Sequence, residues 1–252
     1  MDLFLPRARR RAAALALILF PVAPLSAGAH AEIGRLTMGR TTYPARSWIV
    51  NAAETYTASN LSDPVADTFA SELEVKRGVT DRLTLEFVLE TREARRDRIQ
   101  ADRLGAEALC RLLDRPFQLA ANLEVLPSLH GEAPEVGFGF EVMHNHGPSA
   151  FLLRYEGEAD KEEGEGYQFA HRLEPSAFYR FGLHGLVGTG LEIQPAAGAH
   201  SLALSLGGSV SKNIFLAVQP RFAITSRASD FALHLQLQLY FGPYGLGSWG
   251  LK

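Results

Sequence analysis

The stretch from residue 231 to residue 241, FALHLQLQLYF, alternates between two kinds of side chain along its whole length. Its large apolar positions are Phe231, Leu233, Leu235, Leu237, Leu239 and Phe241. Small or polar positions stand between them: Ala232, His234, Gln236, Gln238 and Tyr240. Successive side chains of a β-strand point to opposite faces, so this pattern predicts a strand with one apolar and one more polar face.

The same period of two recurs through most of the chain. The strands predicted from it cover residues 47–57, 66–77, 82–92, 103–113, 117–127, 135–144, 149–157, 167–181, 186–194, 200–210, 214–225 and 229–241. The segment 103–113 also contains residues that suit a helix, but Glu107 and Arg111 would then interrupt the apolar face, so a strand is favoured. Strands of about ten residues are long enough to cross a membrane at a tilt.

The connections between the predicted strands alternate in length. Short ones cover residues 78–81, 114–116, 145–148, 182–185 and 211–213. The other set is mostly longer and more polar, and it includes 93–102, rich in Arg and Asp, and 158–166, rich in Glu. Outer-membrane barrels have short periplasmic turns, longer extracellular loops and an even number of strands. The predicted fold class is therefore all-β, a single antiparallel transmembrane up-and-down barrel of about twelve strands.

The first 31 residues have the three parts of a signal peptide. Four arginines between residues 7 and 11 precede a short apolar run at 12–20, and small residues offer cleavage sites ending at Ala29 or Ala31. We expect residues 32–46 to form an N-terminal periplasmic segment, 47–241 the barrel and 242–252 a C-terminal tail. The predicted location is the outer membrane of a Gram-negative cell.

Composition excludes several classes of protein. With 252 residues, 46% of them hydrophobic, the chain is too apolar for disorder, and its single Cys allows no internal disulfide. No apolar run after residue 25 is long enough for a membrane-spanning helix. Removing residues 1–31 takes away four Arg and one Asp, so the net charge falls from −3 to −6. That balance argues against nucleic acid as a partner.

Alternation alone does not say which face is buried, because a soluble barrel places its apolar face inside. Aromatic residues near predicted strand ends favour a lipid-facing apolar side, since membrane barrels carry aromatic girdles at both interfaces. These residues are Trp48, Tyr56, Phe69, Phe117, Phe151, Phe181, Phe215, Phe231 and Phe241. Glu54 is an exception, because it stands among the apolar positions of 47–57.

With that orientation, the polar face lines the barrel lumen. The predicted lumen-facing residues are Glu72, Glu74, Lys76, Arg82, Glu86, Glu90, Glu107, Arg111, Glu124, Glu141, Arg154, Glu156, Arg172, Glu174, Arg180, Glu192, Arg221, His234, Gln236 and Gln238. Opposite charges on neighbouring strands can pair across such an interior. We favour structural filling over a selective pore lining for this set, because its mixed signs give no strong ion preference.

A hairpin near the start of the barrel resembles a known family. Residues 72–83, ELEVKRGVTDRL, match the pattern E-L-E-(x)3-G-[V/I/L]-T-D-R-L. This is similar to the first hairpin of proteobacterial transporter-like outer-membrane barrels, nearest the outer-membrane proteins of phenol-degradation gene clusters (the MetA-pathway type). The segment 107–109 and the ending 233–241 fit the same pattern. The resemblance implies passage of small, including apolar, molecules, and it transfers no catalytic residue.

Residues with catalytic or metal-binding chemistry form no convincing set. His144 and His146 have metal-like spacing but lie in a predicted turn without a third ligand. His200 and Ser201 would point to opposite faces of a strand. We therefore predict a non-enzymatic channel or facilitator without cofactor or metal, whose partners are outer-membrane lipid, the barrel-assembly machinery and a small-molecule solute. The alternatives are an outer-membrane lipid-acting hydrolase and a soluble periplasmic ligand-binding barrel.

Overall fold

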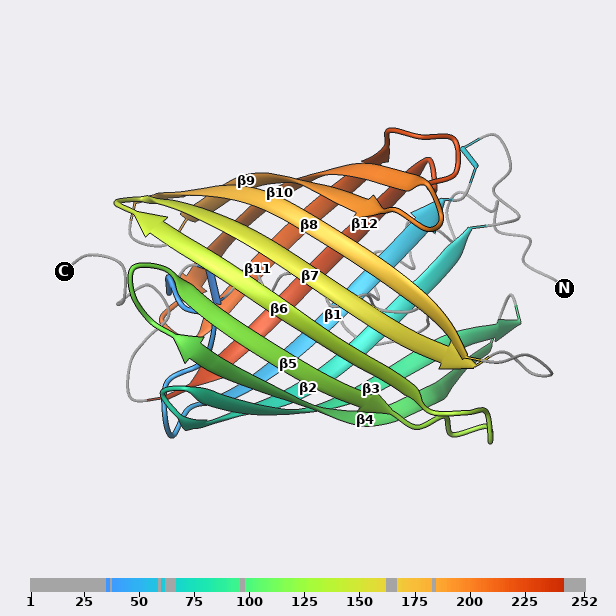
Figure 1. The fold of residues 1–252 in the computed structure, drawn as a ribbon, viewed down its shortest axis with the longest axis horizontal. Helices are drawn as coiled ribbons and strands as arrows, with labels where there is room; N and C mark the ends of the chain where they lie inside the picture. The colour runs from blue at the N-terminus through green and yellow to red at the C-terminus, as the bar shows by residue number, and fades with distance from the viewer. Residues whose placement is uncertain are drawn as a thin grey trace, which may run out of the picture.

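The computed structural model shows twelve antiparallel strands closed into one barrel (Figure 1). It describes residues 35–36, 38–58, 60–61, 67–95, 98–161, 167–182 and 185–242. Each strand pairs with the next in sequence, and β1 closes the barrel by pairing with β12 along its whole length. The predicted up-and-down barrel is confirmed. The predicted signal peptide, residues 1–31, and residues 243–252 of the predicted tail lie outside the described residues.

The strand bounds follow the predicted spans closely. The strands are β1 (Trp48–Ala58), β2 (Thr68–Thr80), β3 (Leu83–Arg95), β4 (Arg98–Leu113), β5 (Gln118–Leu126), β6 (Glu135–His146), β7 (Ser149–Lys161), β8 (Tyr167–Phe181), β9 (Gly185–Gln194), β10 (Ala199–Ser211), β11 (Ile214–Ala223) and β12 (Phe231–Phe241). The helix-like segment 103–113 is a strand, as predicted, and belongs to β4. Among the described residues, no helix has the length and apolar character to span a membrane.

One predicted loop is wrong. The charged stretch 93–102 was expected to connect two strands, but β3 continues to Arg95 and β4 already begins at Arg98. The two strands stay paired to the tip, with Glu93 opposite Ile99 and Arg95 opposite Arg98. Composition suggested a loop because charged residues are unusual in an apolar wall. The pairing of β3 with β4 overrides this signal, because the backbone hydrogen bonds of a hairpin do not depend on the polarity of its side chains.

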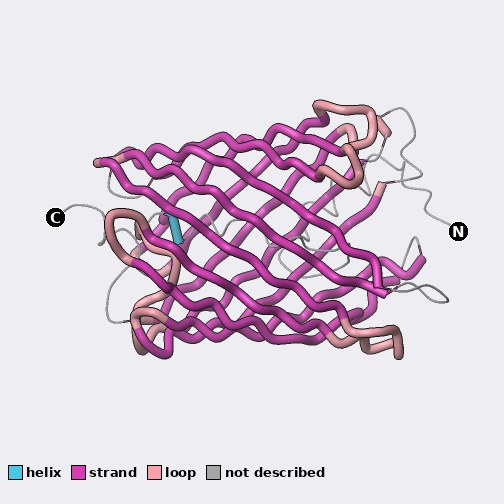
Figure 2. Tube along the Cα trace, viewed as in Figure 1, coloured by secondary structure: helices cyan, strands magenta, loops and turns pink. Residues whose placement is uncertain are grey.

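The two ends of the barrel differ in their connections (Figure 2). We call the end with the tight turns at 81–82, 147–148 and 212–213 the turn end, and the opposite one the loop end. Longer connections lie at the loop end, including 127–134 and 224–230. Residues 35–47 precede β1 and lie at the turn end, on the left in Figures 1 and 2.

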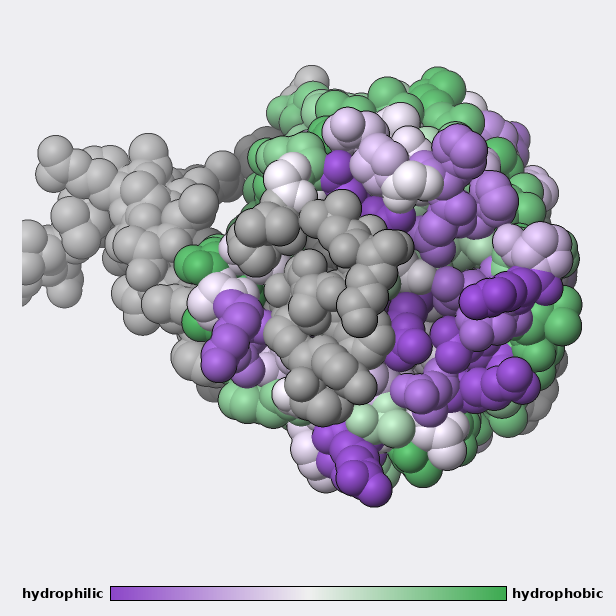
Figure 3. Space-filling model, turned by 90° about the vertical axis from the view of Figure 1, so that its left-hand side faces the viewer, coloured by the Kyte–Doolittle hydropathy of each residue, from purple (hydrophilic) through white to green (hydrophobic). Residues whose placement is uncertain are grey.

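The outer wall is apolar. Its exposed side chains include Phe87, Leu104, Leu123, Phe151, Leu206 and Leu216. Viewed from the turn end, hydrophobic residues surround the sides of the barrel, and hydrophilic ones gather on the visible, described part of the end face (Figure 3). Near the turn end, the Arg77 guanidinium stacks 4.7 Å from the ring centre of Trp48. Near the loop end, the rings of Tyr56 and Phe69 lie 5.0 Å apart.

One aromatic residue was assigned to the wrong face. Phe215 was expected among the outward aromatics at a strand end, but its side chain is fully buried inside the barrel. Ile214 and Leu216 take the outward positions of β11, with Leu216 47% exposed, so alternation turns the ring of Phe215 inward. The ring therefore packs into the barrel core instead of joining the outer girdle.

Candidate functional site

The interior of the barrel is lined by the polar positions of the alternating strands. The structure places these predicted residues on inward positions: Glu72, Glu74, Lys76, Glu86, Glu90, Glu107, Arg111, Glu124, Glu141, Arg154, Glu156, Arg172, Glu174, Arg180, Glu192, Arg221, His234, Gln236 and Gln238. Arg82 is the exception and corrects the prediction, because it lies exposed in the turn between β2 and β3. The strand pattern was extended one residue too far there, past a bulge next to Thr80.

The turn end of the interior holds an apolar layer. Leu36, Met38 and Tyr43 from the segment before β1 are buried there. They belong to a core cluster with inward side chains of the wall, among them Ile49, Met143, Leu152, Phe178, Leu186, Phe215 and Tyr240. Burying apolar side chains from both sides stabilises the segment inside the mouth of the barrel.

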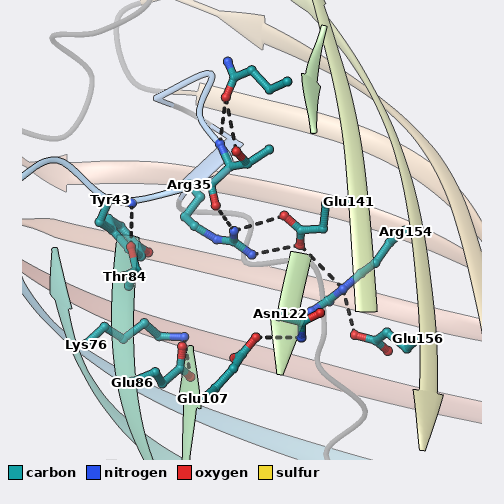
Figure 4. Close-up of polar contacts among 12 residues, drawn as sticks. Arg35, Tyr43, Lys76, Thr84, Glu86, Glu107, Asn122, Glu141, Arg154 and Glu156 are labelled. Carbon is teal, nitrogen blue, oxygen red and sulfur yellow. Dashed lines mark hydrogen bonds and ion pairs between the residues drawn. The ribbon is translucent and has the colours of Figure 1, made fainter. Parts of the chain in front are cut away.

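Hydrogen bonds fix this N-terminal segment to several strands (Figure 4). The Arg35 guanidinium donates two bonds to the Glu141 carboxylate on β6, at 3.0 and 3.1 Å. The amide of Thr41 donates to the side chain of Gln118 on β5 at 3.0 Å, and that of Tyr43 to the Thr84 hydroxyl on β3 at 3.0 Å.

Bonds to so many strands hold residues 35–47 across the opening. The hydroxyl of Tyr43 also accepts a bond from Gln238 on β12, on the opposite side of the mouth from β5 and β6. A bidentate arginine–carboxylate pair adds a fixed geometry as well as energy. The segment therefore lies across the turn end of the interior.

Charged side chains fill the middle of the interior. On one side, Lys76 lies 2.8 Å from Glu74 and 2.7 Å from Glu86, and the amide of Asn122 donates to Glu107 at 2.7 Å. Buried charges require such partners because an uncompensated charge in a dry interior is strongly destabilising. This side, on β2 to β5, is the acidic arc; its carboxylates are Glu72, Glu74, Glu86, Glu90, Glu107 and Glu124.

Arginines concentrate on the other side. Arg154 on β7 lies 2.7 Å from Glu156 and 3.5 Å from Glu141, and Arg172 on β8 lies 3.0 Å from Glu156. Arg221 on β11 pairs with Glu192 and lies 3.8 Å from Glu174. The side from β7 to β11 thus alternates arginines and glutamates, whereas the acidic arc has carboxylates in excess. The interior therefore carries an uneven charge distribution across its width.

Some interior residues were not predicted. Arg103 and Glu135, at the loop end, lie 3.5 Å apart and join β4 to β6. Both residues are at the first position of a predicted strand, where the direction of a side chain is hard to assign. Their charge could have indicated that they face the polar interior. Arg35 belongs to a segment without any period of two, so nothing in the sequence pointed it at Glu141, 106 positions away.

The histidines and the acidic cluster offer little for catalysis or metal binding. His144 and His146 are exposed at the end of β6, while inward His234 is bonded to Thr55 at 3.0 Å. Carboxylate oxygens of Glu72, Glu74 and Glu86 lie within 4.8 Å of one another. Lys76 already bridges two of these carboxylates, so its ammonium group supplies the positive charge that a metal would bring.

The alternative of a lipid-acting hydrolase requires a serine and a histidine together on the outer wall. Outward Ser71 donates to the Glu54 carboxylate at 2.6 Å, and outward His171 bonds the Tyr155 hydroxyl at 2.6 Å. In the part of the chain that the structure describes, no hydrogen bond joins a serine to a histidine side chain on that wall.

Comparisons with known proteins show the fold. No family model matches the sequence, and no curated protein matches it. Among solved structures, an outer membrane channel from Pseudomonas putida F1 is similar, with a TM-score of 0.61 and 14% identity over 79% of this chain and 97% of that one. The NanC porin is similar with a TM-score of 0.54 and 11% identity over 77% of this chain and 99% of that one. The chain thus shares the barrel architecture of outer-membrane channels.

Proposed function

We propose that this protein is an outer-membrane channel or facilitator for small molecules. The observation that carries the proposal is the reversal of polarity: an apolar outer wall encloses an interior of charged and amide side chains. A soluble ligand-binding barrel has the opposite arrangement, with its apolar face inside. The shared architecture with two channels supports the same conclusion.

The orientation in the membrane follows from the connections. Short turns face the periplasm in barrels of this type, so the turn end, with residues 35–47, is periplasmic and the loop end extracellular. Outer-membrane lipid then covers the apolar wall. Phe241 is the last residue of β12, and we propose it as the aromatic signal for the barrel-assembly machinery.

The second part of the proposal concerns the kind of solute that passes. The hairpin at 72–83 resembles the barrels of phenol-degradation gene clusters, which supports passage of small molecules with apolar parts. We infer no enzymatic step. Incubation of the purified barrel with phospholipid should release no fatty acid, and release above that of a boiled sample would contradict the channel assignment.

Conduction requires the N-terminal segment to move, because that segment lies across the periplasmic mouth. The double variant Arg35→Ala, Tyr43→Ala removes the pair with Glu141 and the bond from Gln238. Glu141 keeps Arg154 at 3.5 Å, so the wall retains a partner for its charge. In planar bilayers we expect the wild type to conduct in brief openings and the double variant to stay open several times longer.

The matched control is Arg82→Ala, which removes an arginine from an exposed turn and should leave the openings as in the wild type. Absence of conductance from the wild type and from both variants, all folded, would overturn the channel proposal. Equal open times in wild type and double variant would show that the segment is not the barrier.

A further inference from the structure

At the loop end, the interior holds a cavity of about 280 Å³. Its walls come from β1, β2 and β8 to β12, with a contribution from the connection between β11 and β12. In the proposed orientation this cavity is the extracellular entrance of the lumen. It lies away from the apolar layer and the N-terminal segment described above.

The charges that line the cavity are mainly positive. Arg172, Arg221 and Arg227 contribute three guanidinium groups, against the single carboxylate of Glu192. Arg221 is paired with Glu192 and lies 3.8 Å from Glu174, and Arg172 is paired with Glu156 through its Nε at 3.0 Å. The donors left for a ligand are therefore the terminal nitrogens of Arg172 and the guanidinium group of Arg227.

Arg172 on β8 lines the cavity. Its Nε lies 3.0 Å from Glu156, while its two terminal nitrogens make no hydrogen bond to any residue that the structure describes. Arg227 stands at the rim on an exposed loop, where one terminal nitrogen donates to the carbonyl of Ala197 at 3.3 Å. A guanidinium group offers a planar fork of donors that matches the two oxygens of a carboxylate.

The rest of the lining is apolar or neutral. The methyl groups of Ala70, Ala199, Ala228 and Ala232 line the cavity, and Thr57 and Ser201 add hydroxyls. Its volume lies just below the range of about 300–1,000 Å³ typical of sites for drug-sized ligands. A ligand that fits must therefore be small, with an anionic group for the arginines and a short apolar body for the alanines.

We propose that this cavity binds a small organic monoanion, a carboxylate on a compact apolar body, with Arg172 and Arg227 as its donors. Glu192 and the nearby Glu156 oppose a second negative charge, which favours a monoanion over a dianion. The proposal deepens the channel function and rests on it: the cavity is the first binding site that a solute meets on entering from outside.

Three compounds of one shape and different charge test the proposal. Benzoate, benzyl alcohol and benzylammonium are titrated calorimetrically into the full-length barrel in neutral detergent at low salt. We expect benzoate to bind at least tenfold more tightly than either other compound, and its affinity to fall as salt is raised. Equal affinity for the three compounds, or tighter binding of benzylammonium, would overturn the proposal.

Two variants locate the site, and a third serves as control. Arg172→Gln and Arg227→Gln keep a polar side chain of similar length. Each should weaken the affinity for benzoate at least tenfold and leave the affinity for benzyl alcohol unchanged. Arg82→Gln, in the exposed turn at the other end, should change neither of these two affinities. Arg227→Gln changes a loop residue, so the test stands even where Arg172→Gln fails to fold.

Binding and conduction separate the two proposals. Tight, arginine-dependent binding of benzoate by a barrel that never conducts would support the cavity proposal and contradict the channel proposal. Conduction without any preference for benzoate in the titrations would support the channel proposal and contradict the cavity proposal. Benzoate binding that is unchanged in both arginine variants would place the anion elsewhere and refute this cavity.

Discussion

Glu54 shows how a single residue can depart from the pattern that surrounds it. Its carboxylate lies on the outward face of β1 and accepts a hydrogen bond from the Ser71 hydroxyl on β2 at 2.6 Å. Tyr56, two residues closer to the loop end, belongs to the outer aromatic row with Phe69. A polar neighbour and the nearby interface together reduce the cost of a carboxylate on an apolar wall.

Replacement of Glu54 by Leu should stabilise the barrel. The change removes a charge from the proposed lipid-facing wall, so we expect the free energy of unfolding to rise by up to about 1 kcal/mol. Urea titration of the barrel folded into lipid vesicles, followed by tryptophan fluorescence, measures this change.

The inward counterpart Glu156→Leu serves as the comparison. It deprives Arg154 and Arg172 of their nearest carboxylate, and we expect a loss of about 3–5 kcal/mol. Destabilisation by Glu54→Leu of similar size would mean that Glu54 also faces a protein environment.

At the scale of elements, β12 shows most clearly which face of the wall points outward and which points inward. Leu235 points outward beside Glu54, and its neighbour Gln236 points inward and is 5% exposed. A strand with strict alternation has no freedom to rotate, because a shift by one residue would exchange both faces. Adjacent positions on β12 should therefore respond in opposite ways to the same substitution.

Leu235→Arg should block assembly, because an arginine in the apolar band costs about 2–4 kcal/mol near the midplane. Gln236→Arg should assemble, since the inward face already holds arginines paired with glutamates. The measurement is the fraction of each variant that migrates as folded barrel on a gel when the sample has not been boiled. Folding of Leu235→Arg together with failure of Gln236→Arg would mean that the faces are inverted.

At the scale of the molecule, closure of twelve strands removes every exposed sheet edge, since β1 and β12 pair along their full length. Unfolding then requires breaking a continuous ring of hydrogen bonds. We expect the protein to be recovered in the membrane fraction and to need detergent for its extraction. We also expect its mobility on a gel to change when the sample is boiled. Recovery as a soluble periplasmic protein without detergent would contradict the proposed membrane location.

Particular residues show where prediction from sequence stopped. Alternation over 231–241 and its repeats predicted the strand class, and it assigned inward positions that the structure also gives to Glu74, Arg154 and Gln238. It failed at boundaries, where Arg82 belongs to a turn and where 93–102 continues as strands. A strand ends where pairing ends, and pairing depends on the neighbouring strand.

The two-faced character of the strands can be read from the residues alone, because the period of two is a local property of side-chain direction. Three features depend on tertiary contacts: residues 35–47 lie across the turn end, Arg35 meets Glu141, and arginines far apart in sequence share one cavity. Those contacts arise from closure of the ring, which brings strands separated by a hundred or more residues across a common interior. No local pattern records which residues will face one another there.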